Sequence, residues 1–184
     1  MSRGTRRVPD DRKLWNKLCR GDREAFERFY EQNFGPLRNF LRIYLRNQHA
    51  AEDVAQETFI ELWQNPNGFG RWHSSLKAYI FGVARNRGAD WRRSERRGSE
   101  AETLREPRAA GEERRLEVRD AMSQLEPELA SLLWLRGVEG YSYEELSQIF
   151  DIPVGTVRSR LFAAREQLRR IWRGLNPGRE HGMS

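Results

Sequence analysis

Two helix signals separated by a three-residue turn, at residues 142–172, constrain the fold most strongly. Ser142 and Glu145 have the spacing of a capping box, which marks a helix start, and residues 151–153 form the turn that follows. The next helix is predicted over residues 154–172, because its apolar side chains share one stripe: Val157, Leu161, Ala164, Leu168 and Ile171. Two short helices across such a turn, the second of them basic, are typical of a helix-turn-helix.

The remaining chain is predicted to be helical as well, because no stretch alternates apolar and polar residues as a strand does. Asp22 is a candidate N-cap for a first long helix, in which Gly35-Pro36 can introduce a kink. A further helix over residues 49–63 stops at a Pro- and Gly-containing breaker, and another begins at Ser74 or Ser75. These helices predict a first domain at residues 10–97.

A second domain is predicted at residues 114–173, where two helices precede the helix-turn-helix. Leu116, Met122 and Leu125 mark the first of them, and the second begins at Pro127 and ends at Gly137. The predicted fold class is therefore all-α, with two small helical domains, the second containing four helices.

Charge is segregated along the chain. The 184 residues include 33 Lys or Arg, only three of them lysine, against 27 Asp or Glu, for a net charge of +6. Residues 49–62 carry acids and no Lys or Arg, whereas residues 84–97 and 154–173 are rich in arginine. Residues 98–113 are acidic and hold one large apolar side chain, too little to order the segment. We therefore predict a flexible acidic linker at 98–113 and two basic surfaces suited to nucleic acid.

Several classes of protein are excluded by what the sequence lacks. Cys19 is the only cysteine, which rules out an internal disulfide and a Cys-based zinc site. We find no signal-peptide pattern and no apolar run long enough to span a membrane, so we expect a cytoplasmic protein without membrane insertion. There is no P-loop, and we predict no catalytic residues, no cofactor and no metal.

The predicted helix from residue 75 to 97 interleaves aromatic side chains with arginines, as single-stranded nucleic acid binding requires. The preceding loop, residues 65–74, contains Phe69 and Trp72 and could shape a pocket for an extruded base. Buried aromatics beneath a surface of arginines would give the same pattern. Tyr79 and Phe81 cannot both face one way, so one of them is expected in the core.

The basic helix at residues 154–172 presents a different surface opposite its apolar stripe. Thr156 lies in the first turn, where backbone N–H groups favour a phosphate, and Arg158 and Ser159 could reach base edges in a major groove. Phe162 could touch a thymine methyl group. The alternative is a solvated basic helix in a bundle.

An acidic face is predicted on the helix at residues 49–63, where Asp53, Gln56 and Glu57 fall together. Three explanations are open: a solvated polar face, a metal site using these carboxylates with His49, or a surface that fits a basic groove on a protein partner.

Three motifs occur in order along the chain. They are Ala51-Glu52-Asp53-Val54-Ala55-Gln56-Glu57-Thr58-Phe59, Tyr79-Ile80-Phe81-Gly82-Val83-Ala84-Arg85-Asn86, and Tyr141-Ser142-Tyr143-Glu144-Glu145-Leu146 with Pro153-Val154-Gly155-Thr156-Val157-Arg158-Ser159-Arg160-Leu161. In these motifs, over about residues 11–173, the sequence resembles the extracytoplasmic function (group IV) sigma factors of bacterial RNA polymerase.

The resemblance implies a role for each surface. Asp53, Gln56 and Glu57 would grip the coiled coil of the polymerase β′ clamp, and the second domain would meet the β flap. The residues expected to bind the -10 element are Phe69, Trp72, Arg85, Asn86, Arg87, Trp91, Arg92 and Arg93. Those expected to bind the -35 element are Thr156, Arg158, Ser159, Arg160, Phe162 and Arg165. An anti-sigma factor is the expected regulator, and Ala163 departs from the basic residue found in many relatives.

Two rival functions remain at this point. One is a helix-turn-helix repressor or activator, in which residues 10–97 would bind a ligand or dimerise. The other is a nucleic-acid enzyme with a metal held by Glu52, Asp53, Glu57 and Glu61.

Overall fold

The computed structural model describes residues 8–69, 75–95 and 120–175, and within these ranges every regular element is a helix. The elements are α1 (Val8–Cys19), α2 (Arg23–Leu45), α3 (Gln48–Gln64), η1 (Pro66–Phe69), α4 (Leu76–Glu95), α6 (Pro127–Gly137), α7 (Tyr143–Phe150) and α8 (Val154–Leu175). The predicted all-α fold is confirmed. The predicted linker at 98–113, the loop at 70–74 and the start of the second domain at 114–119 lie outside the described residues.

Side-chain caps begin the helices of the first half. At the start of α2 the carboxylate of Asp22 accepts a hydrogen bond from the backbone N–H of Ala25, at 3.0 Å, as the sequence predicted. Ser75, rather than Ser74, caps α4, because its Oγ accepts from the backbone N–H of Ala78 at 3.1 Å. The helix α2 continues without interruption through Pro36.

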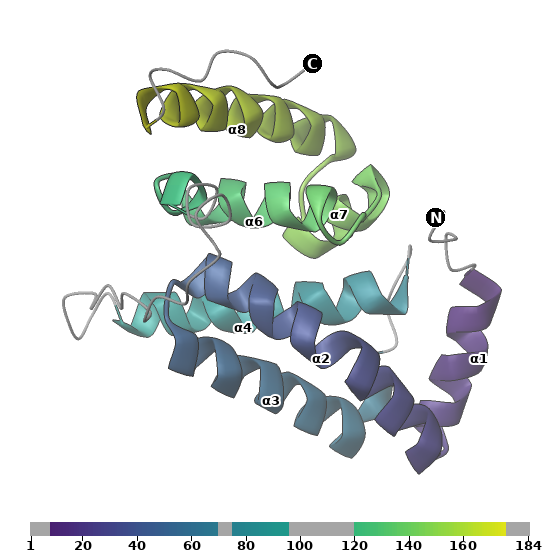
Figure 1. Ribbon diagram of the computed structural model, residues 1–184. Helices are drawn as coiled ribbons and strands as arrows, with labels where there is room; N and C mark the ends of the chain where they lie inside the picture. The colour runs from purple at the N-terminus through teal and green to yellow at the C-terminus, as the bar shows by residue number, and fades with distance from the viewer. Residues whose placement is uncertain (1–7, 70–74, 96–119, 176–184) are drawn as a thin grey trace.

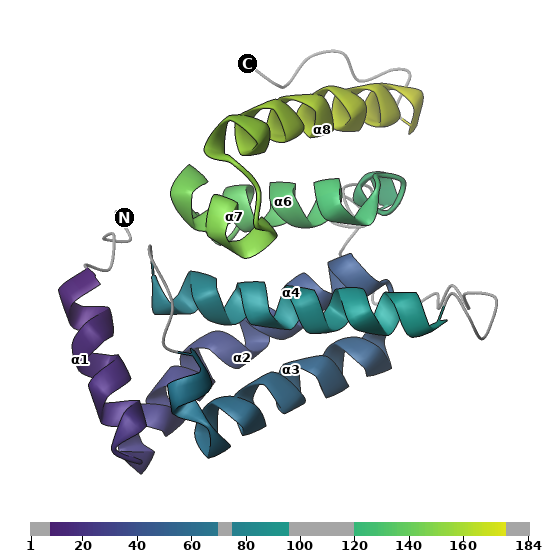
Figure 2. The ribbon, with the colours of Figure 1, turned by 180° about the vertical axis from the view of Figure 1, so that it is seen from behind.

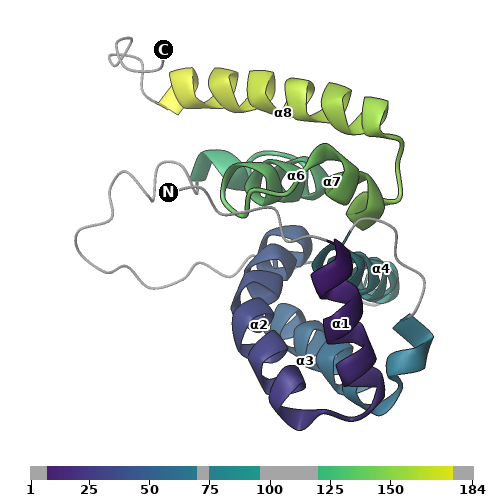
Figure 3. The same cartoon turned by 90° about the vertical axis from the view of Figure 1, so that its right-hand side faces the viewer.

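Helix α1 has no counterpart in the sequence-based prediction. It stands at one end of the bundle formed by α2, α3 and α4 (Figures 1 and 3). Asp11 on α1 is 2% exposed, and its Oδ2 accepts a hydrogen bond of 2.9 Å from the backbone N–H of Leu76. A carboxylate is favourable at the positive N-terminal end of a helix, so Asp11 helps to fix the start of α4.

The predicted helix-turn-helix is present in the second half. Ser142 and Glu145 form a reciprocal capping box, with hydrogen bonds of 3.1 and 2.9 Å, and α7 ends at Asp151 in the left-handed conformation with φ 52°. Pro127 is at the start of α6, as expected. On α8 the first three members of the apolar stripe are fully buried, and the last two are half-buried.

The two halves pack against each other and share one hydrophobic core. Helices α6 and α7 form a layer over α2 and α4, and α8 is the outermost helix (Figures 1 and 2). Across this contact the ring of Phe81 lies 5.3 Å from that of Tyr141, and Phe40 meets Phe150 edge to face at 6.3 Å. A Cβ atom at Gly82 on α4 would lie 3.4 Å from the carbonyl oxygen of Gln148 on α7, so the two helices approach closely there.

No helix in the described part of the chain is both long enough and apolar enough to span a membrane.

Candidate nucleic-acid and protein interfaces

The exposed face of α8 carries the side chains predicted to contact duplex DNA. Arg158 and Ser159 are exposed, and Phe162 is 67% exposed, a high value for a large apolar side chain. Thr156 is half-buried, and its carbonyl oxygen accepts a hydrogen bond of 3.0 Å from Ser159 Oγ. The prediction that this face points away from the core is therefore confirmed.

An aromatic side chain from the other helix of the motif orients Arg158. The guanidinium groups of Arg158 and Arg136 lie 5.5 and 5.0 Å from the ring centre of Tyr143, one of the first residues of α7. Arg136 also donates a hydrogen bond of 2.8 Å to the carbonyl oxygen of Tyr141. Cation–π contacts of this kind limit the positions that the Arg158 side chain can sample.

Two other arginines of α8 have different surroundings. Arg165 is exposed, whereas Arg160 is half-buried and bonds to Glu128 on α6, with 3.0 Å between Nη1 and Oε2. The structure therefore places Arg160 in a contact within the second half, apart from the exposed face that carries Arg158.

Helix α4 carries most of the residues predicted to bind the -10 element, and the structure separates them into two groups. Asn86 and Arg93 are exposed, and Arg93 pairs with Asp90 on the same helix. The other four residues are half-buried: Arg85, Arg87, Trp91 and Arg92. Phe81 is in the core and Tyr79 is half-buried, which answers which of these two aromatics faces inward.

The half-buried arginines of α4 already have partners. Arg87 forms an ion pair with Glu61 and lies 3.8 Å from a carboxylate oxygen of Glu57, both on α3. The guanidinium of Arg92 lies 5.3 Å from the ring centre of Tyr44. Phe69 is the last residue of η1, whereas Trp72 lies outside the described residues.

The acidic face on α3 is present, but arginines from other helices neutralise part of its charge. Asp53, Gln56 and Glu57 are all exposed on the same side of the helix, as predicted. Glu52 pairs with Arg38 at 3.5 Å, and Glu57 and Glu61 pair with Arg87. The local sequence suggested acids without basic partners, and this was wrong for these glutamates, because the arginines come from α2 and α4.

An apolar groove adjoins the acidic face, and the sequence analysis missed it. The groove encloses about 460 Å³ between α2 and α3, with Gln56 at its edge. Ile60 and Trp63 line it and are 53% and 42% exposed, and the ring of Trp63 lies 4.8 Å from that of Phe26. The spacing of residues 56, 60 and 63 places them on one helix face, which is the signal that could have revealed it.

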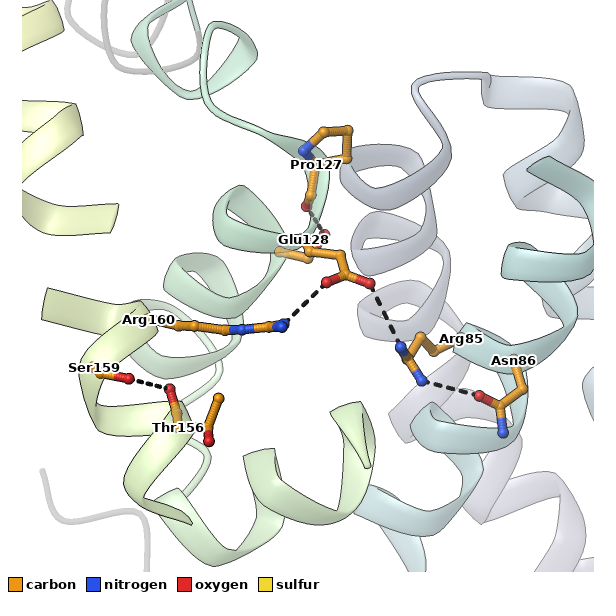
Figure 4. Close-up of polar contacts among 8 residues, drawn as sticks. Arg85, Asn86, Pro127, Glu128, Thr156, Ser159 and Arg160 are labelled. Atoms are coloured by element: carbon orange, nitrogen blue, oxygen red, sulfur yellow. Dashed lines mark hydrogen bonds and ion pairs between the residues drawn. The ribbon is translucent and has the colours of Figure 1, made fainter. Parts of the chain in front are cut away.

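A single carboxylate connects the two basic helices, as Figure 4 shows. Glu128, in the first turn of α6, lies 3.5 Å from Arg85 Nη2 on α4 and 3.0 Å from Arg160 Nη1 on α8. Arg85 also donates to Asn86 Oδ1 at 3.1 Å and lies 5.8 Å from the ring centre of Phe150. No sequence signal pointed to Glu128, because its partners are 43 and 32 residues away.

Buried polar groups mark the contact between the halves. Lys77 Nζ on α4 lies 3.1 Å from Glu139 and 4.8 Å from the ring centre of Tyr141. Burial, helped by Glu139 and Glu145, raises the pKa of Tyr141 well above its usual value of 10.0. Among the described residues, no group of His, Cys, Asp and Glu is arranged to hold a metal ion.

Comparison with known proteins extends this picture. The family model for sigma-70 region 2 matches residues 29–98, and that for sigma-70 region 4 matches residues 115–168. The RNA polymerase sigma-H factor of Pseudomonas aeruginosa is 29% identical over 177 residues, which cover 86% of this chain and 91% of that protein. The ECF sigma factor SigL of Mycobacterium tuberculosis is 37% identical over 130 residues, covering 65% of this chain and 72% of SigL.

Solved structures agree with these matches. The chain is similar to the sigma factor RpoE of Bartonella quintana, crystallised with the anti-sigma factor NepR, with a TM-score of 0.69, 26% identity, and coverage of 80% of this chain and 96% of that one. CnrH in complex with the cytosolic domain of CnrY has the same fold, with a TM-score of 0.67 and 21% identity over 89% of this chain and 97% of that one.

The fold and its surfaces define an all-α DNA-binding protein whose second half contains a helix-turn-helix. The chain belongs to the extracytoplasmic function family of bacterial sigma factors. It therefore binds RNA polymerase and directs promoter-specific transcription initiation, and sigma factors are not enzymes.

Proposed function

We propose that α8 reads the -35 element and that α4 reads and helps to melt the -10 element. The observation that carries the proposal is the exposed face of α8, where Arg158, Ser159 and the 67% exposed Phe162 lie on the second helix of a helix-turn-helix. Water is a poor environment for an exposed phenyl ring, whereas a thymine methyl group in the major groove is a good one. Thr156, Arg160 and Arg165, on the same helix, are assigned supporting contacts with the DNA of the -35 element.

The -10 assignment depends on α4 and the loop before it. Asn86 and Arg93 are exposed for contact, whereas Arg85, Arg87 and Arg92 would have to exchange their present partners for DNA. Trp91, half-buried against the core, is assigned to the same element. Phe69 and Trp72 are assigned to the capture of an extruded base. Stacking of each extruded base contributes about 1–3 kcal/mol, so no nucleotide hydrolysis is needed for opening.

Core polymerase would bind the acidic face of α3 together with the apolar groove beside it. Asp53 and Gln56 provide polar contacts next to Ile60 and Trp63, and a polar rim around an apolar centre is the usual composition of a protein interface. The β′ clamp coiled coil is the assigned partner of this surface, and the β flap is assigned to the second half.

Regulation by an anti-sigma factor is the last part of the proposal. Two similar solved structures, RpoE and CnrH, each contain a second protein, described for RpoE as an anti-sigma factor. The chain would meet such a regulator and the polymerase in the cytoplasm. We assign residues 10–97 to core binding and the -10 element, 98–113 to a flexible linker, and 114–173 to the -35 element.

The test is run-off transcription with core polymerase across a promoter library, with and without the protein. We expect initiation at a distinct set of promoters that depends on the protein. The double variant Gln56→Ala, Glu57→Ala should lose core binding, whereas the matched change Gln32→Ala, Glu31→Ala on the exposed side of α2 should not. Tight operator binding by the protein alone, without promoter-specific initiation, would contradict the proposal and favour a simple repressor.

A further inference from the structure

We propose that helix α1 sets the position of the part of the molecule assigned to base capture, and that Asp11 is the positioning residue. This part consists of η1 and the first turn of α4, residues 76–79, and is called the capture end below. Asp11 holds the start of α4 in a fixed place and thereby sharpens the choice of base at the -10 element. The inference rests on the proposed function, because it takes Phe69 and α4 as contacts of that element.

Helix α1 carries none of the residues assigned to polymerase or promoter, yet it touches both parts of the capture end. It packs against η1, whose last residue is Phe69, and it bonds to Leu76, the first residue of α4 (Figures 2 and 3). At its other end α1 is joined to α2 by a tight turn, in which Gly21 has a φ of 72°. The helix therefore connects the longest helix of the first half to the capture end.

Asp11 is a charged residue on the face that α1 turns toward the core. Leu14, Trp15 and Leu18 follow it at positions i+3, i+4 and i+7, which places all four side chains on one side of the helix. Leu18 is buried, and Leu14 and Trp15 pack partly buried against the core. At 2% exposure the carboxylate of Asp11 costs free energy unless it is hydrogen-bonded. Attachment of α1 by apolar contacts alone would not require a carboxylate at this position.

The hydrogen bond of Asp11 is directional and reaches the backbone of α4. Its Oδ2 accepts from the N–H of Leu76 at 2.9 Å. The first N–H groups of a helix have no partner within the helix, and a negative charge is favourable beside them. Ser75 already supplies a local cap, since its Oγ accepts from the N–H of Ala78 at 3.1 Å. The bond from α1 therefore adds a second constraint, which fixes where α4 begins relative to α1 and η1.

Base capture requires such a fixed place. An extruded base is identified by hydrogen bonds to its edge and by stacking in a closely fitting pocket. Hydrogen bonds weaken steeply when their geometry is displaced, so a shift of one wall of the pocket reduces the preference for the correct base. Phe69 on η1 and Asn86 on α4 can act on the same strand only while η1 and α4 keep their relative position. Asp11 touches no DNA in this proposal and acts through the backbone of Leu76.

The experiment measures base discrimination by holoenzyme assembled from core polymerase and the full-length protein. One probe is a single-stranded oligonucleotide with the -10 sequence of a promoter that the wild type uses, and the others carry single base substitutions in that sequence. Discrimination is the ratio of the affinities for the original and the most weakly bound substituted probe. Asp11→Ala has no acceptor and should lower this ratio about fivefold, within the range that one base contributes. Asp11→Asn keeps an acceptor oxygen and should restore most of the ratio.

Asp22→Ala is the matched control. It removes a carboxylate cap of similar geometry, 3.0 Å from the N–H of Ala25, but from α2 rather than α4. This variant should lose stability and keep the discrimination of the wild type. Asp11→Ala should in turn keep the affinity of the wild type for core polymerase and for duplex DNA with the -35 element.

Asp11→Glu is the second perturbation. It keeps the charge but lengthens a buried side chain by one methylene group, so the start of α4 must shift or the hydrogen bond must break. The ratio should therefore fall in this variant as well. Circular dichroism identifies any variant that fails to fold, and the other Asp11 variant then carries the test.

Amide hydrogen exchange measures the bond itself. Leu76 is the first residue of α4, so its N–H depends on Asp11 rather than on the helix for protection. Exchange at Leu76 should be slow in the wild type and in Asp22→Ala, and fast in Asp11→Ala.

Two results would overturn the positioning role of Asp11. One is a folded Asp11→Ala or Asp11→Glu variant that discriminates as well as the wild type, or in which Asp22→Ala loses discrimination to the same extent, because Asp11 would then be a stabilising cap only. The other is equal exchange at Leu76 in the wild type and Asp11→Ala. Failure of the proposed function is a separate result, in which the wild-type holoenzyme binds every substituted probe as tightly as the original.

Discussion

Replacing Ser75 by alanine should remove two hydrogen bonds, one that caps the start of α4 and one that joins this start to Glu145 on α7. Ser75 Oγ accepts from the backbone N–H of Ala78 at 3.1 Å and donates to Glu145 Oε1 at 2.8 Å, while Glu145 Oε2 accepts from the N–H of Ser142. A lost N-cap costs about 1 kcal/mol, and a lost bond to a carboxylate costs about 1.5 kcal/mol at the low end of its range. We therefore expect the free energy of unfolding to fall by about 2.5 kcal/mol.

Urea unfolding of the full-length protein measures this loss. With a slope near 2 kcal/mol per molar urea, the midpoint should fall by about 1.2 M. A double-mutant cycle of Ser75→Ala with Glu145→Ala should give a coupling of about 1 kcal/mol, whereas Ser75→Ala with Asn47→Ala, a cap on α3, should be additive. If the first pair is also additive to within about 0.3 kcal/mol, the hydrogen bond between Ser75 and Glu145 does not stabilise the contact between α4 and α7.

Three further predictions concern the surfaces. Arg158→Ala should cost about 1–3 kcal/mol of -35 affinity and relax the preference at one base pair, measured by binding to a set of single-substitution duplexes; equal loss at every sequence would make Arg158 a phosphate contact. Trp63→Ala should weaken the binding of core polymerase about tenfold, roughly 1.4 kcal/mol, in a titration with labelled protein. The reason is that a 42% exposed indole at an interface is a typical binding hot spot. Unchanged affinity would show that the groove is not part of the interface. Because folding raises the pKa of Tyr141, the stabilisation from its neutral hydroxyl is complete below pH 10 and is lost as the pH rises toward the pKa of the folded state. Tyr141→Phe should therefore abolish this alkaline loss of stability in urea unfolding measured as a function of pH. The same variant should not destabilise the protein at pH 7, and a loss above about 1 kcal/mol there would show that the hydroxyl has a hydrogen-bond partner.

Local features of the fold were accessible from the sequence. The capping box at Ser142 and Glu145, the N-cap at Asp22 and the buried stripe of α8 depend on residues three or four apart, and such patterns are visible in one sequence. The face of α3 that carries Asp53, Gln56 and Glu57 was predicted for the same reason.

Features that depend on distant parts of the chain were missed. Asp11 caps α4 from 65 residues away, and Arg85 meets Glu128 across 43 residues. The packing of α7 on α4 depends on complementary surfaces of the two halves. The sequence pattern of each half predicts a separate domain and gives no sign of this contact. The assumption that the acids of α3 lack basic partners failed for this reason, because Arg38 and Arg87 are remote in sequence.

The close approach at Gly82 has a consequence for the modularity of these proteins. A chimera that joins the first half of this chain to the helix-turn-helix of a relative would preserve every local helix signal and both DNA-facing helices. It would still place an unrelated α7 surface against α4, where the carbonyl of Gln148 and the backbone of Ile149 now fit a position without a side chain. The chimera would therefore keep both DNA-facing helices while losing the fit between α4 and α7, and its folded stability would differ from that of either parent.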